Sequence, residues 1–423
     1  MRAHLLALAA VSGLVGCNGC LGNPSPVGAR GSQLPNACSA TQPLTEPQKL
    51  DILFVIDNSS SMGDDQQNVA QGLVAFIDEI KKGGGVETDF HVGVINTSVY
   101  LSFESQAGQK FPLRLFPDSN GKLQPVPDTA TFVGDKVVRT FGPDPERMLV
   151  GSDPELVAKL QRLVMQGTDG SGQETPYEAV RLALFDQNAT PLSEGGNGGF
   201  FRDGARLLVV VLSDEDDCSE DVRPPTVFVS DRTDVDDCLE QTNQLTPVSE
   251  YFRLFTQEAR DNAGRRRDIV WAEIAPVSTI DKKAMVFQAG PGAQVQNIDC
   301  STSNAPGFRH VQMAQLFDPT LKNLDSICST DLNGNPSFTE MLKGFADLVN
   351  VSQTLAVTGV PDPRLLQVSL TRFDGKVQLC TVGNGGISYS APTQADAAQL
   401  HFSGVCQRFA DDKAVSVNLL CAN

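Results

Sequence analysis

The chain has 423 residues, with 51 acidic and 33 basic side chains and a formal net charge of −18. A length well above that of one average domain predicts one enlarged domain plus a smaller module. Because like charges repel, so acidic a protein is a poor partner for nucleic acid and for anionic lipid. We therefore expect no nucleic-acid partner, whereas the charge suits solubility and the binding of cations.

The first residues predict export. Residues 1–16 have the pattern of a signal peptide, because Arg2 is followed by an apolar stretch from Leu5 to Val15 that is too short to span a bilayer, which needs about 20 residues. The sequence Leu-Val-Gly-Cys that ends at Cys17 resembles a bacterial lipobox. This resemblance implies cleavage before Cys17 and its lipidation. The alternative is an ordinary secreted protein whose signal ends near a cysteine.

The resemblance also bears on localisation. Asn18, and no aspartate, follows Cys17, and in lipoproteins of double-membrane bacteria this implies sorting to the outer membrane. No second apolar segment has spanning length, so we expect the lipid to be the only membrane contact. Residues 17–49 are rich in Gly, Pro, Ser, Asn and Gln and are predicted to be a flexible tether.

Residues 50–352 alternate apolar strands with amphipathic helices, which predicts an α/β domain with a doubly wound, mostly parallel sheet. Long insertions interrupt it at 98–150, which has no clear pattern of elements, at 218–246, which is acidic, and at 278–335, which is predicted to be irregular. Residues 353–423 are predicted to be a small β-rich region, because apolar residues alternate at 366–370 and 415–417. The predicted strands are 52–56, 90–97, 207–212 and 268–277, and the predicted helices are 64–82, 154–165, 175–185, 248–261 and 339–351.

Export favours disulfide bonds. Of the ten cysteines, nine remain if Cys17 carries lipid, so at least one is unpaired or pairs outside the chain. The folded part has no two CxxC pairs that would predict a zinc site. We expect three bridges, which join Cys218 to Cys238, Cys300 to Cys328, and two of the three cysteines Cys380, Cys406 and Cys421.

Two loops after apolar strands carry candidate metal ligands. Asp57, Ser59 and Ser61 form a DxSxS pattern directly after the strand 52–56, and their oxygens can turn towards one point. Asp214 follows the uniformly apolar strand 207–212, although the alternative for Asp214 is a solvated acidic loop. Because ligands of open α/β sheets bind at the carboxyl ends of strands, these oxygens predict a site for Mg²⁺ or Ca²⁺.

The segments DILFVIDNSSSM and LLVVVLSDEDDC resemble those of von Willebrand factor A (VWA) domains that carry a metal-ion-dependent adhesion site. The resemblance covers about residues 50–352 and implies that Asp57, Ser59, Ser61 and Asp214 hold the ion. In overall layout the chain also resembles VWA lipoproteins of myxobacteria.

The remaining ligand of the VWA family, a threonine, has no matching residue here. In GSGQETPYEAV, Glu174 occupies its place and Thr175 is one residue away, where its spacing from Glu178 predicts a helix-capping box. Glu174 would be a third carboxylate, which favours Ca²⁺ and reduces the need for an acidic partner residue. Alternatively, Glu174 points away, and water or Thr175 completes the site.

Other patterns are less specific. Residues 331–336 begin like an EF-hand loop without its glycine, and the aspartates of 231–237 fit a solvated loop. His91, His310 and His401 have no nucleophile motif nearby. We therefore expect a cell-envelope protein, not an enzyme, whose metal site binds a protein or polysaccharide ligand. The alternatives are a scaffolding subunit with a structural metal and a metal-assisted hydrolase, for which no general base is evident.

Overall fold

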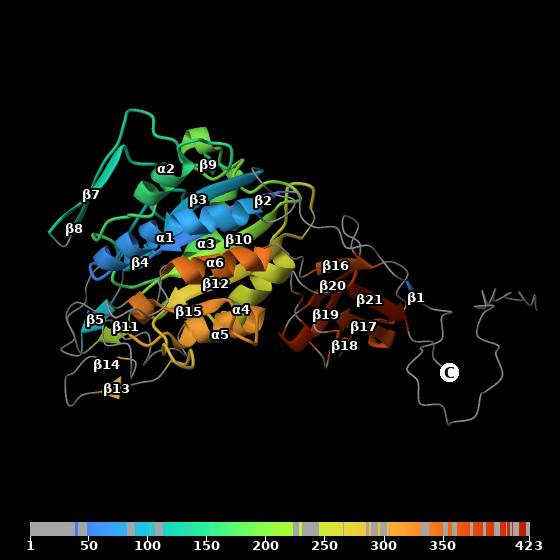
Figure 1. The fold of residues 1–423 in the computed structure, drawn as a ribbon. Helices are drawn as coiled ribbons and strands as arrows, with labels where there is room; N and C mark the ends of the chain where they lie inside the picture. The colour runs from blue at the N-terminus through green and yellow to red at the C-terminus, as the bar shows by residue number, and fades with distance from the viewer. Residues whose placement is uncertain are drawn as a thin grey trace, which may run out of the picture.

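The computed structural model describes most of the chain between residues 49 and 419, and two residues before it (Figure 1). The predicted signal peptide 1–16, Cys17 and most of the predicted tether lie outside the described residues, as do 231–237 and 331–336. The described residues are 39–40, 49–82, 89–101, 103–105, 113–134, 136–222, 228–230, 245–264, 266–284, 287–288, 295–296, 303, 305–330, 338–349, 354–357, 362–372, 375–383, 386–392, 398–402, 404–406, 408 and 414–419.

A six-stranded, mostly parallel sheet forms the centre of a mixed α/β domain, in the order β15–β12–β10–β2–β3–β9. The predicted strands are confirmed. All residues of β2 and β10 are buried, as expected for central parallel strands that are covered on both faces. The strands are β2 (Leu50–Ile56), β3 (Phe90–Asn96), β9 (Leu149–Val150), which is antiparallel, β10 (Arg206–Leu212), β12 (Asp268–Ala275) and β15 (Leu324–Ser326).

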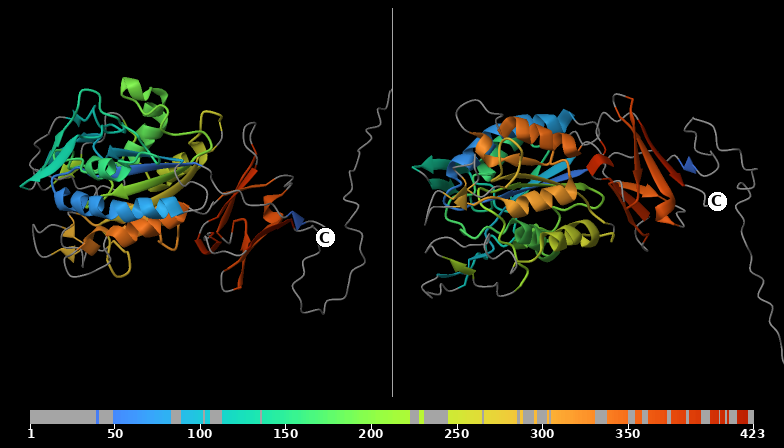
Figure 2. Two further views of the ribbon diagram at one scale, coloured as in Figure 1. Left: turned by 45° about the horizontal axis from the view of Figure 1, so that its top comes forward. Right: turned by 90° about the horizontal axis from the view of Figure 1, so that it is seen from below.

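Helices cover both faces of this sheet (Figure 2). On one face Phe76 of α1 packs edge-on against Phe54 of β2, with ring centroids 5.5 Å apart. On the other, Trp271 of β12 stacks on Phe255 and on Phe317. The first face carries α1 (Gly63–Lys82), α2 (Leu156–Leu163) and α6 (Phe338–Val349), and the second carries α3 (Pro176–Arg181), α4 (Val248–Arg253) and α5 (Phe308–Phe317). None of the helices in the described part of the chain combines the length and apolarity that crossing a membrane requires.

The predicted helices are confirmed, with π-helical turns continuing two of them. The turn Leu182–Asp186 follows α3, and Leu254–Glu258 follows α4. The short helical turns elsewhere are η3 (Gln187–Ala189), η4 (Leu192–Glu194), η7 (Ile327–Thr330), η8 (Pro363–Leu365) and η9 (Gly404–Cys406).

The prediction that 278–335 is irregular is wrong, because α5 and β15 lie within it. The buried side of α5 includes Arg309 and His310, so its apolar periodicity is weak. The insertion 98–150 supplies the edge strand β9 and a hairpin. Small two-stranded sheets pair β4 (Tyr100–Leu101) with β6 (Arg114–Leu115), β5 (Phe103–Ser105) with β11 (Phe228–Ser230), β7 (Thr129–Val133) with β8 (Lys136–Thr140), and β13 (Phe287–Gln288) with β14 (Val295–Gln296).

The C-terminal region is β-rich, as predicted, and consists of two antiparallel sheets in the orders β1–β21–β17–β18 and β16–β20–β19. The strand β1 (Ser39–Ala40), which lies within the predicted tether 17–49, pairs with β21. The remaining strands are β16 (Thr354–Val357), β17 (Leu366–Thr371), β18 (Val377–Thr381), β19 (Ile387–Ser390), β20 (Ala398–Phe402) and β21 (Ala414–Leu419).

A disulfide joins Cys380 to Cys406, which confirms one pair among the last three cysteines. By constraining the unfolded chain it contributes about 3 kcal/mol to stability, on the entropic account of such bridges. Cys218 and Cys328 are also disulfide-bonded. Their predicted partners, Cys238 and Cys300, lie outside the described residues, as does Cys421.

We predict that Leu73→Ala lowers the free energy of unfolding by about 2–5 kcal/mol, because truncating a core leucine leaves a cavity. Leu73 is 0% exposed, whereas its neighbour Val74 is 45% exposed. Val74→Ala is therefore the matched control, with an expected change within about 0.5 kcal/mol. Urea denaturation followed by the fluorescence of Trp271, the single tryptophan, reports unfolding of the large domain. Equal losses in the two variants would contradict the packing of α1.

Candidate metal centre

Four loops meet at the carboxyl end of the parallel sheet, at 57–62, 97–98, 166–175 and 213–219. Backbone hydrogen bonds that extend the strand ladders bring three of them together. The Asp57 amide donates to the Leu212 carbonyl at 2.9 Å, and the Thr97 amide donates to the Ile56 carbonyl at 3.2 Å. The full-length register of β2 with β10 therefore places the two predicted ligand loops side by side.

The DxSxS loop is closed around its aspartate. The Asp57 carboxylate, which is buried, accepts a hydrogen bond from the Ser59 amide at 2.8 Å and one from the Ser213 hydroxyl at 2.7 Å. The hydroxyl oxygens of Ser59 and Ser61 lie 3.1 Å apart. Ser61 is exposed, so this loop reaches from the protein interior to solvent.

Glu174 and Thr175 point in different directions. The Thr97 hydroxyl donates to the Glu174 carboxylate, which faces the same interior space as Asp57. The Thr175 hydroxyl instead donates to the Thr97 carbonyl at 2.6 Å. Of the two alternatives for the threonine position, the geometry therefore favours Glu174.

The predicted capping box of Thr175 and Glu178 is wrong. Thr175 makes no side-chain cap, because its hydroxyl bonds to the Thr97 carbonyl, and the Glu178 carboxylate pairs with Arg181. The Ser219 hydroxyl accepts from the Glu178 amide at 3.0 Å. A side chain from the acidic loop after β10 thus binds this end of the helix, which a local sequence pattern cannot show.

The carboxyl groups of this cluster repel one another. Burial raises the pKa of Asp57, and burial together with the charges of Asp57 and Glu215 raises the pKa values of Glu174 and Asp214 well above the usual range. Asp65, in the first turn of α1, has a pKa raised to about 7 by burial and by its acidic neighbours. Within the described part of the chain, Asp57, Glu174 and Asp214 form no ion pair.

Two oxygens of this cluster lack a hydrogen-bond donor among the described residues. They are Glu174 Oε1 and Asp214 Oδ1, in side chains that are 0% and 2% exposed. Leaving a buried charged oxygen unsatisfied costs several kcal/mol, so a cation or a proton is expected there. Among the described residues no three Asp, Glu, His or Cys side chains converge to form a metal site by themselves. The hydroxyls of Ser59 and Ser61 would have to complete an all-oxygen donor set, which suits Mg²⁺ or Ca²⁺.

Three residues that sequence analysis missed hold the loops together. Gln66 of α1 is buried, and its amide group donates to the carbonyls of Asp57 and Gly167 at 2.8 and 2.9 Å. The signal was a glutamine in register with the apolar face of α1, three residues before Val69. The Ser98 hydroxyl donates to the Asn58 side chain at 2.7 Å.

Gly170 completes this contact between the loops. Its amide donates to the Asn58 carbonyl at 2.8 Å. A Cβ atom at Gly170 would lie 2.4 Å from the Asn58 side chain, so the close approach of the two loops requires glycine.

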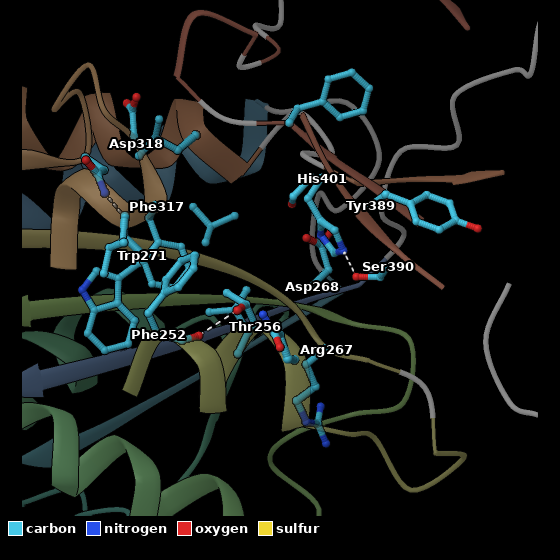
Figure 3. A pocket seen from close by; sticks show the side chains of 18 residues that line it. Phe252, Thr256, Arg267, Asp268, Trp271, Phe317, Asp318, Tyr389, Ser390 and His401 are labelled. Carbon is cyan, nitrogen blue, oxygen red and sulfur yellow. Dashed lines mark hydrogen bonds between the residues drawn. The ribbon is translucent and has the colours of Figure 1, made fainter. Parts of the chain in front are cut away.

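A cavity of about 260 Å³ lies elsewhere, between the large domain and the C-terminal strands (Figure 3). Phe252, Phe317 and Trp271 form one wall, and His401 and Tyr389 lie on the other. It opens beside Asp268, at the amino end of β12 and thus at the opposite edge of the sheet from the metal loops. Its apolar wall does not suit a cation.

No family model matches the chain, and no curated protein matches it. Solved structures similar to it include proximal thread matrix protein 1 from the mussel byssus (12% identity, TM-score 0.33, 74% of this chain and 50% of that one). The pilus adhesin SpaC of Lactobacillus rhamnosus GG is also similar, with 12% identity and a TM-score of 0.32 over 90% of this chain and 39% of that one. The pilus adhesin RrgA of Streptococcus pneumoniae has 10% identity and a TM-score of 0.30 over 90% of this chain and 58% of that one. The chain thus spans at most 58% of the length of these proteins, and the scores are too low to assign a fold or function.

We predict that, in chelator, the free energy of unfolding falls as the pH rises from about 4 to about 7. Over this range the unfolded chain has released protons that the buried carboxyl groups of the folded protein retain, Asp65 with its pKa of about 7 included. Raising the pH therefore favours the unfolded state. Urea denaturation across this range measures the slope, and Glu174→Gln, which removes one titrating group, should flatten it. A slope that is unchanged in this variant would argue against the cluster.

Proposed function

We propose that residues 50–352 form a doubly wound VWA-type domain that binds Mg²⁺ or Ca²⁺ and, through the ion, a protein or polysaccharide ligand. The strand order supports this proposal. In chain order this sheet begins with the central strand β2. The strands β3 and β9 then extend it on one side, and β10, β12 and β15 extend it on the other. The order thus reverses between β2 and β10, where doubly wound sheets bind ligands, and Asp57 and Asp214 lie at that point.

The unsatisfied buried oxygens of Glu174 and Asp214 carry the proposal. Asp57 has hydrogen-bond donors for both of its oxygens, whereas these two carboxylates each retain one oxygen without a donor among the described residues. A dication would satisfy both oxygens and offset the mutual repulsion. Asp57, Ser59, Ser61, Glu174 and Asp214 would hold it, and Thr175 would support the loop through its bond to Thr97.

The ligand class follows from the charge of the site. Three carboxylates exceed the charge of one dication, so the bound partner need not supply an acidic group. Neutral oxygens, such as sugar hydroxyls or peptide carbonyls, would fit, and Ca²⁺ accepts them readily. The exposed Ser61 marks the side from which such a group could approach. We propose that a lipid on Cys17 anchors this domain at the outer membrane.

A structural role for the metal is the second candidate. The observation that favours it is burial, because Asp57, Glu174 and Asp214 are all enclosed. In this alternative the ion joins the loops of a scaffolding subunit and contacts no partner. A metal-assisted hydrolase is the third candidate, and it would need a general base in addition to the ion.

We predict that calorimetric titration of the full chain with Ca²⁺ or Mg²⁺ shows one bound ion, and that Asp57→Asn and Asp214→Asn abolish the binding. Removing a carboxylate ligand takes both charge and a coordinating oxygen from the ion. Asp64→Asn is the matched control, because Asp64 is an exposed carboxylate beside the same loop. Its binding should stay within about twofold, as expected for a solvent-screened charge. Equal weakening in Asp64→Asn would indicate a diffuse charge effect.

The two candidates separate in a binding assay with whole cells and with purified envelope polysaccharide. If the ion mediates adhesion, binding disappears in chelator, returns with Ca²⁺ or Mg²⁺, and is absent in Asp57→Asn. If the ion is structural, the unaltered chain loses thermal stability on chelation but shows no metal-dependent binding to either material.

A further inference from the structure

The loop 213–219 has two acidic sides. Asp214 faces the carboxyl cluster, while Asp216 and Asp217 turn the other way, towards the first turn of α5. All three side chains are at most 2% exposed. The loop is thus a thin layer between the candidate metal centre and a second buried polar cluster on the α5 side of the sheet.

Arg309 is the main contact on that second side. Its backbone amide donates to the Asp216 carboxylate at 2.9 Å, and its guanidinium donates to the Asp217 carboxylate at 2.8 Å. It also donates to the carbonyls of Ser219 and Thr246, at 3.4 and 2.8 Å. Because Arg309 is 4% exposed, these bonds are poorly screened by solvent.

The His310 side chain contacts the backbone of the same loop. Its ring nitrogen Nε2 lies 3.2 Å from the Glu215 carbonyl oxygen, and Nδ1 lies 3.0 Å from the Glu273 carboxylate. Burial alone would lower the pKa of His310, but the Glu273 carboxylate raises it to about 9. The ring is therefore protonated at neutral pH and donates from both nitrogens. The Tyr177 hydroxyl and the Trp271 indole donate to Glu273 and fix it in turn.

We infer that Arg309 and His310 are positioning residues that hold the Asp214 loop in its metal-binding conformation from the side opposite to the ion. This inference rests on the proposed function. Neither side chain reaches the metal loops' open side, and both act through groups of 215–219. Outer contacts of this kind change metal affinity by about 10- to 100-fold when they are removed. The buried ion pair of Arg309 with Asp217 is by itself weak evidence that Arg309 stabilises the fold. We therefore assign Arg309 a role in positioning the loop.

The test compares Arg309→Met and His310→Gln with one matched control variant at the other edge of the sheet. Arg202 pairs there with the buried Asp51 at 2.7 Å, so Arg202→Met also breaks a buried ion pair but leaves the metal loops untouched. We expect about a 10- to 100-fold loss of Ca²⁺ affinity in the α5 variants and less than a twofold change in Arg202→Met. Arg309→Lys, which keeps the charge, should recover part of the affinity.

Amide hydrogen exchange provides a readout that does not depend on the ion. In Arg309→Met the amide of Cys218, which donates to the Glu174 carbonyl at 2.7 Å, should exchange faster, while the amides of β2 stay protected. If Arg309→Met does not fold, Arg309→Lys and His310→Gln carry the test. Unchanged affinity in both would overturn the inference. Failure of the unaltered chain to bind any ion would overturn the proposed function, whereas faster local exchange would still show that Arg309 holds the loop.

Discussion

Buried negative charge at the carboxyl end of β2 and β10 is the constraint on which this structure depends. Removing a carboxylate from water costs several kcal/mol unless donors or a counter-charge replace the lost hydration. The protein meets this cost unevenly. Asp57 receives a hydroxyl and an amide, Asp217 receives a guanidinium, and Glu273 receives a protonated imidazole. Glu174 and Asp214 keep oxygens without a donor among the described residues. Asp216, on the other side of the same loop, also keeps one oxygen without a donor among the described residues. The proposal of a cation site rests on Glu174 and Asp214, because these two carboxylates belong to one cluster with Asp57.

The sheet fixes that place through register more than through any single contact. β2 and β10 pair over seven residues in parallel, so Asp57 and Ser213 come to the same level of the same edge. Both faces of the sheet are covered by helices and apolar side chains, and the side chains of Asp57, Glu174 and Asp214 are at most 2% exposed. The lower dielectric that results makes the repulsion within the cluster stronger and would make an ion at its centre more tightly held.

The sequence allowed the strands and the DxSxS loop to be predicted because both are local. Five apolar residues before Asp57 and six before Ser213 define buried strands without reference to the rest of the chain. The parts that could not be predicted depend on distant partners. The buried face of α5 is partly made of Arg309 and His310, so a pattern of apolar residues could not reveal it. The choice between Glu174 and Thr175 was likewise open, because the Thr97 carbonyl that engages Thr175 lies 78 positions away in the chain.

The carboxylates of the proposed metal site are buried, but the loop beside them is partly exposed to solvent. Arg309 and His310 of α5 restrain the loop 213–219 on the side away from the carboxyl cluster. Gln66 of α1 restrains the backbone of Asp57. In the DxSxS loop, by contrast, Ser60 and Ser61 are exposed. A purely structural ion would gain nothing from an open side, because solvent competes for its coordination and weakens the link between loops. An ion that binds a partner requires one coordination position that is accessible from solvent, while its protein ligands are held rigidly. The arrangement of restrained carboxylates and an exposed hydroxyl therefore supports the proposed adhesion more than the scaffolding alternative.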